Sequence, residues 1–178
     1  PTNATLAMFK TGLKSFKAQL KNQQDVVQVA EISINKSIVT KEKKVFPEED
    51  FLARIDMLAA LKKKVLITRF SHYVHLSSYL NRFRVEEIGM VLGAYHFAQL
   101  FTGQRQKLSF FESLWTLFSK NMRLFIYPFQ EEDKTLTTSH NLKIAKKYLP
   151  FVQFLRDNHY IEDLLVKDAT HLTVYSRK

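Results

Sequence analysis

The chain has 178 residues, which suffices for one domain with its own core, and its 46% hydrophobic and 25% charged residues exclude wholesale disorder. Its 27 lysines and arginines against 17 aspartates and glutamates leave a net charge of +10, which attracts phosphates, acidic partners and anionic lipid. The sequence contains no cysteine, which excludes disulfides, thiolate metal sites and thiol nucleophiles and fits a reducing compartment.

A single soluble, cytoplasmic domain is expected. No apolar run approaches the roughly 20 residues that cross a bilayer, and the N-terminus lacks the pattern of a secretory signal. No repeat or Gly/Ser linker divides residues 1–178, and the tail from residue 164 onward is weakly patterned. Because the first residue is Pro1 and not Met, this domain can be a fragment of a longer protein.

Helical and strand patterns alternate along the chain. An amphipathic helix is predicted over residues 4–21, where lysines lie opposite the apolar positions: Lys10, Lys14, Lys17 and Lys21. Strands are predicted at four β-branched or apolar stretches, 26–34, 65–68, 87–92 and 122–127. Further helices are predicted from residue 47 onward and at 72–83, 95–101, 109–120 and 150–158, whereas residues 135–142 favour neither type.

This alternation indicates an α/β fold built from βαβ units with right-handed crossovers. We expect an open, mainly parallel sheet of about four strands with helices on both faces, Rossmann-like and in three layers. An all-helical alternative, in which residues 65–68 and 124–127 belong to buried helices, stays open because short apolar runs do not discriminate between the two.

In an open parallel sheet the ligand site lies at the carboxyl ends of the strands. The second predicted strand leads to Arg69, Ser71 and His72. Ser71 would cap the next helix, whose unpaired amides attract an anion. Arg69 would bind the same anion through two hydrogen bonds from its guanidinium. Alternatively, Ser71 is a plain cap and Arg69 pairs with Glu86 or Glu87.

The next two strands add further candidates for ligand binding at the same edge. The third strand leads to Gly93, Tyr95 and His96, and the fourth to Tyr127 and Gln130. Gly93 would let the ligand approach the backbone closely.

Two residues are candidates for proton transfer. An imidazole titrates near working pH, so His72 could act as general acid or base beside an anionic substrate. Glu31 is the acidic candidate, and its alternative is a hydrated carboxylate on an edge strand. His72 and His75 share a helical face and could bind a metal with His96, but no carboxylate stands at fixed spacing, so no metal site is predicted.

Familiar signatures are absent from the sequence. It contains no Walker loop, GxGxxG, HExxH, GxSxG or paired Cys motif. Basic and aromatic residues mix at 79–84, but no RNA- or DNA-binding module accompanies them, so nucleic acid is not an expected partner. The residues themselves identify no cofactor.

Four stretches together resemble a known family: LITRFSHYVHLSSYLNRF, EIGMVLGAYHFAQLF, FFESLWTLFSKNMRLFIYPF and LPFVQFLRDNHYIEDL. In this order they are similar to an uncharacterised bacterial family, some of whose members are labelled nicotinate-nucleotide adenylyltransferase, over roughly residues 25–165. The resemblance implies a nucleotide-binding α/β domain that uses ATP and magnesium. The family has a Gly-Gly pair where this chain has Ser109 and Phe110, and its phosphate-binding His-x-x-His follows the first strand, so no catalytic role is transferred to His72 and His75.

The sequence therefore predicts an α/β domain that binds an anionic, phosphorylated or nucleotide-like ligand at its strand ends, with a transferase-type enzyme as one form of this function. The alternative is a non-catalytic interaction domain that docks an acidic protein or an anionic membrane surface through its basic N-terminal helix. The sequence leaves open whether the protein is an enzyme and which oligomeric state it adopts.

Overall fold

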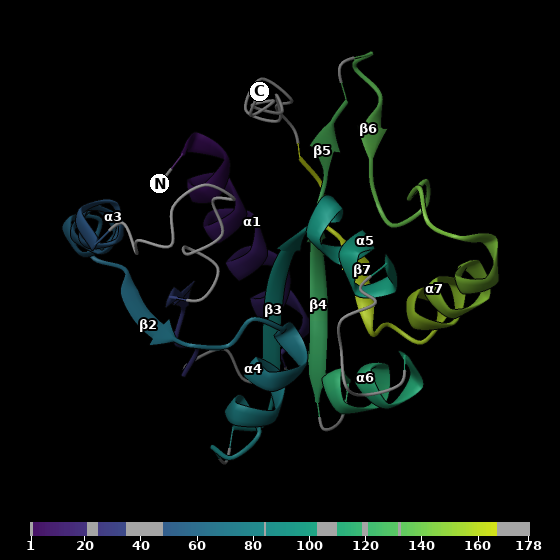
Figure 1. Cartoon of the computed structure of the whole chain (residues 1–178), viewed down its shortest axis with the longest axis horizontal. Coiled ribbons are helices and arrows are strands. Elements are labelled where there is room, and N and C mark those ends of the chain that lie inside the picture. The colour runs from purple at the N-terminus through teal and green to yellow at the C-terminus, as the bar shows by residue number, and fades with distance from the viewer. Residues whose placement is uncertain are drawn as a thin grey trace.

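The computed structural model describes residues 2–20, 25–34, 48–83, 85–102, 110–118, 121–131 and 133–166. Within them helices alternate with parallel strands, as Figure 1 shows, so the predicted α/β class is confirmed. In chain order the elements are α1 (Asn3–Gln19), β1 (Val29–Ser33), α3 (Glu48–Ala60), β2 (Lys64–Thr68), α4 (Tyr73–Leu80), β3 (Ile88–Gly93), α5 (Ala94–Thr102), α6 (Phe110–Leu117), β4 (Met122–Tyr127), β5 (Phe129–Gln130), β6 (Leu136–Thr137), η1 (Lys146–Tyr148), α7 (Leu149–Asp157) and β7 (Ile161–Asp163).

The parallel strands form two ladders. β1 pairs with β2, and β4 lies between β3 and β7 in a three-stranded sheet. The four predicted strands are therefore divided into two pairs, and in the view of Figure 1 β2 runs downward whereas β3 and β4 run upward. The short strand β7, which the sequence pattern did not predict, completes the larger sheet.

Helices cover both faces of the three-stranded sheet, which gives three layers. Leu124 and Ile126 of β4 face the larger apolar cluster, to which α4, α5, α6 and α7 contribute. The alternate residues Phe125 and Tyr127 form the smaller cluster, against which α1 packs. A strand covered on both faces is expected to be apolar throughout, as β4 is apart from Arg123.

Helix α1 lies very close to β3 because glycines stand at the contact. A Cβ added to Gly12 would come within 2.4 Å of Val91 Cγ2, and one added to Gly89 would come within 2.6 Å of Phe16 Cδ2. The Phe16 ring also meets Phe125 edge to face, with centroids 6.0 Å apart. The apolar side of the basic N-terminal helix is therefore part of the core.

Two further segments bear on the predictions, the start of α7 and the stretch 135–142. α7 carries a proline in its first turn, as predicted from Pro150. The stretch 135–142 forms β6 and a turn, and β6 pairs with β5 in an antiparallel hairpin whose turn residue Lys134 has a φ of 67°. Among the described helices none has the length and hydropathy of a membrane span.

Candidate functional site

Three of the predicted binding residues meet at the carboxyl edge of the three-stranded sheet. Gly93, the last residue of β3, lies opposite Tyr127, the last residue of β4. Helix α5 begins at the next residue, and His96 Nδ1 lies 3.6 Å from the position that a Cβ on Gly93 would take. A side chain at position 93 would therefore point toward the His96 imidazole.

The Tyr127 hydroxyl is the most unusual group at this edge. The Tyr127 side chain is 3% exposed, and its hydroxyl has no hydrogen-bond partner within the described part of the chain. Burial raises the pKa of this hydroxyl above 10.0, so it is a neutral donor at physiological pH. A buried hydroxyl without a partner costs about 1–3 kcal/mol, which an oxygen supplied by a ligand would recover.

The first turn of α5, which follows Gly93 directly, adds positive potential at this edge of the sheet. This turn contains no acidic residue, and the N–H groups at the start of a helix have no partner within it. These amides and the helix dipole favour a phosphate or carboxylate. Tyr95, 60% exposed, stands beside His96 with the two ring centroids 5.8 Å apart.

The candidates at the end of β2 belong to the other ladder. Arg69, Ser71 and His72 follow β2, which runs in a different direction from β3 and β4 in Figure 1. The N-cap position of α4 is His72, so the prediction that Ser71 caps this helix is wrong. Glu87, one of the two acids considered as a partner of Arg69, pairs with Arg123 at 3.3 Å.

Glu31 lies in the middle of β1, also in this second ladder. Its carboxylate accepts a hydrogen bond from Thr68 Oγ1 at 2.5 Å, across the β1–β2 pair. Burial, and secondly the charge of Glu31, raise the pKa of Tyr73 to about 12. Glu31 is thus a half-buried, hydrogen-bonded carboxylate and not a hydrated one, and the structure does not bring it to the edge with Gly93 and Tyr127.

Gln130 is engaged in the β5–β6 hairpin. Its side-chain amide donates to the backbone carbonyl of Lys134 at 3.3 Å. The same hairpin is fixed by Glu131, which accepts from Lys143 Nζ at 2.6 Å and from Thr137 Oγ1 at 2.9 Å. Gln130 therefore has a structural partner in the hairpin.

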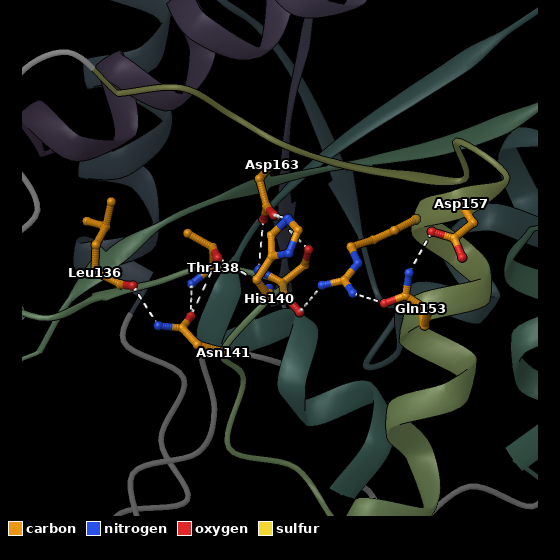
Figure 2. Close-up of polar contacts among 9 residues, drawn as sticks. Leu136, Thr138, His140, Asn141, Gln153, Asp157 and Asp163 are labelled. Carbon is orange, nitrogen blue, oxygen red and sulfur yellow. Dashed lines mark hydrogen bonds and ion pairs between the residues drawn. The ribbon is translucent and has the colours of Figure 1, made fainter.

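A cluster that the sequence did not reveal occupies the end of β7. Figure 2 shows Asp163, whose carboxylate accepts from the Ser139 backbone N–H at 2.8 Å and from Ser139 Oγ at 2.7 Å. His140 Nε2 lies 3.5 Å from the same carboxylate. Ser, His and Asp meet here, but the serine donates to the aspartate and not to the imidazole, so the histidine cannot take its proton as in a hydrolase triad. No spacing motif links residues 139 and 163, and only the fold brings them together.

Among the described residues no group of three His, Asp or Glu side chains is placed to hold a metal ion. His72 and His75 stay a pair, with ring centroids 5.9 Å apart.

No protein-family model, curated protein or solved structure matches this chain. The similarity to the adenylyltransferase-labelled family therefore stays a prediction, and the geometry of the site alone supports a function.

Proposed function

We propose that this protein binds an anionic ligand, phosphorylated or nucleotide-like, at the carboxyl edge of the β3–β4–β7 sheet. The observation that carries the proposal is the buried hydroxyl of Tyr127, which has no hydrogen-bond partner among the described residues, on the strand position that pairs with Gly93. An anionic oxygen would accept hydrogen bonds from this hydroxyl and from the first-turn amides of α5. His96 lies next to Gly93.

The charge of the molecule supports the sign of the ligand. The net charge of +10 draws anions from a distance, and no acid in the first turn of α5 opposes them. The exposed ring of Tyr95 gives a planar group, such as a nucleobase, a surface to lie on.

A transferase-type enzyme in the cytoplasm is the catalytic form of this proposal. In the proposed site, Tyr127, His96 and the first-turn amides of α5 make the primary contacts with the anion. A role for Arg69 or His72 requires that the ligand reach from this edge to the end of β2, since the two ladders are separate.

The test is calorimetric binding of inorganic phosphate, AMP and a sugar phosphate to wild-type protein and two variants. Tyr127→Phe should weaken binding by about 10- to 100-fold, the scale of one hydrogen bond to a charged group, and should not destabilise the free protein. Gly93→Ala should weaken binding and still fold, because a Cβ at this position meets only His96 Nδ1 within 4 Å, at the ordinary contact distance of 3.6 Å.

Tyr79→Phe on α4 is the matched control, since it removes a tyrosine hydroxyl away from this edge and should leave affinity unchanged. Equal affinity of wild type, Tyr127→Phe and Gly93→Ala for every anion would refute the proposed site.

A second function is favoured by the exposed lysines of α1. Lys10 and Lys14 face solvent, whereas Gly12 and Phe16 pack on the sheet, so docking to an acidic protein or an anionic membrane would use charge alone. Reversing the charge of Lys10, Lys14 and Lys17 should then abolish sedimentation with anionic vesicles and spare binding of small anions. Unchanged sedimentation would exclude this surface.

A further inference from the structure

The opposite, amino-terminal edge of the same sheet contains a hollow of about 690 Å³. It lies where β4 and β7 begin, and the end of α1, the end of α6 and the turn between α7 and β7 border it. This volume falls within the range of small-molecule sites, and the function proposed above does not use it.

A side-chain amide bridges two opposite charges in this hollow. Arg123 Nη1 donates to Gln19 Oε1 at 2.6 Å, and Gln19 Nε2 donates to a carboxylate oxygen of Glu162. The guanidinium thus binds the carbonyl of an amide while the carboxylate binds its N–H. This arrangement is a recognition pair for an amide edge, and in the free protein the chain's own Gln19 occupies it.

The charges near Arg123 disfavour an anion at this place. Glu87 Oε2 lies 3.3 Å from Arg123 Nη2, so Glu87 and Glu162 together place two carboxylates around one guanidinium. Counting the described residues alone, a phosphate or carboxylate would meet two carboxylates and one guanidinium here, whereas a neutral amide needs no counter-charge. The hollow therefore selects a different class of ligand from the carboxyl edge.

Aromatic rings form one wall of the hollow. Phe118 and Tyr160 line it, with their ring centroids 5.5 Å apart, and the Phe154 ring stacks on Tyr160 at 6.2 Å. Tyr160 is 37% exposed, so part of its ring is accessible to a planar ligand from the hollow.

The backbone at the rim of the hollow is held in an unusual conformation. Asn121 has a φ of 36° and His159 a φ of 57°, and both residues line the hollow. Left-handed conformations at residues other than glycine cost energy and concentrate at ligand sites. In this chain they turn the backbone so that the ends of α6 and α7 border the same space.

We propose that this hollow binds a neutral, planar molecule with an amide edge, such as an aromatic carboxamide or a cyclic amide. The ligand carbonyl accepts from Arg123 and its N–H donates to Glu162, in place of the Gln19 side chain. Its ring lies against Tyr160 and Phe118.

The experiment is an NMR titration of the ¹⁵N-labelled protein with benzamide, which has the required edge and ring. Benzamide should shift the side-chain signals of Gln19 and Arg123, whereas benzoate and N,N-dimethylbenzamide, which lack the N–H, should not. Gln19→Ala removes the internal competitor and should tighten benzamide binding by roughly two- to tenfold, the scale of one net hydrogen bond. Glu162→Ala should abolish binding.

Gln153 provides a matched control on the surface of α7. It also bridges an arginine and an acid, since Arg156 Nη2 donates to its carbonyl and its amide donates to Asp157 at 2.7 Å (Figure 2). It does not border the hollow, so Gln153→Ala should leave benzamide affinity unchanged.

Absence of benzamide binding to both the wild type and Gln19→Ala would overturn the inference. Equal binding of benzamide and N,N-dimethylbenzamide to the wild type would do the same and requires no variant to fold. Both results are independent of the anion test at Tyr127, which concerns the other edge of the sheet.

Discussion

Substitution of Gly12 by alanine tests whether α1 is part of the core. Alanine in place of an interior helical glycine normally adds about 1 kcal/mol of stability. Here the new Cβ would lie 2.4 Å from Val91 Cγ2, far inside contact distance, and Val91 is a branched side chain fixed in a paired strand. Forcing α1 away from β3 costs about 1–3 kcal/mol, so we expect a net loss of up to about 2 kcal/mol.

This loss should be visible in chemical and thermal unfolding. For a chain of this size 1 kcal/mol corresponds to roughly 2–4 °C, so Gly12→Ala should lower Tm by up to about 8 °C. Val91→Ala removes the clashing methyl groups, and the double variant should be more stable than the sum of the single changes predicts, by about 1–2 kcal/mol. Ala18→Gly at an exposed position of the same helix measures the propensity contribution alone.

An increase in Tm for Gly12→Ala, or simple additivity with Val91→Ala, would refute the close packing of α1 on β3. Such a result would also strengthen the alternative function, since a helix released from the sheet could present its apolar side to a partner. If Gly12→Ala destabilises the protein and couples to Val91→Ala, the apolar side of α1 is packed on the sheet. Any docking by α1 could then use only its lysines.

Three further predictions concern hydrogen bonds and ionisation. Asp163→Ala should cost about 1–3 kcal/mol in urea unfolding, because it leaves the N–H and hydroxyl of buried Ser139 without their acceptor; a change near zero would contradict this. The pKa of Tyr73 is raised to about 12, so its contribution to stability is complete below pH 10.0 and lost as the pH rises toward 12; Tyr73→Phe should remove this part of the alkaline loss. Hydrogen bonds from Lys143 and Thr137 hold the pKa of Glu131 below 4.5, so the hairpin contact should persist above pH 4.5 and disappear as the pH falls further; NMR shifts of the hairpin should lose that transition in Lys143→Ala.

Local patterns predicted the type of several elements. The apolar run 122–127 forms a strand covered on both faces, and the helices after residues 93 and 149 begin within one residue of the predicted starts. Glycine at the end of β3 and proline in the first turn of α7 act through their own backbone geometry, so a single sequence reveals them.

Pairing between distant segments was not predictable in the same way. Alternation of strands and helices suggests adjoining strands, but nothing local states that β2 pairs only with β1 while β3 pairs with β4. β7 escaped prediction because it has three residues and two of them are acidic. The cluster of Asp163 with Ser139 depends on β7, so the sequence did not predict it either.

The candidate site was predicted in part for the same reason. Gly93, His96 and Tyr127 follow strands that do adjoin, and the fold brings them together. Arg69 and His72 follow a strand of the other ladder, so the rule that strand ends gather at one edge does not extend to them.

Helix α1 connects the two proposed sites physically. Near its start Met8 packs against the cluster that contains Tyr127, and at its end Gln19 bridges Arg123 and Glu162. The contact at Gly12 lies between these two points and fixes the helix against β3. The close contact at Gly12 therefore holds α1 in the position from which it reaches both proposed sites.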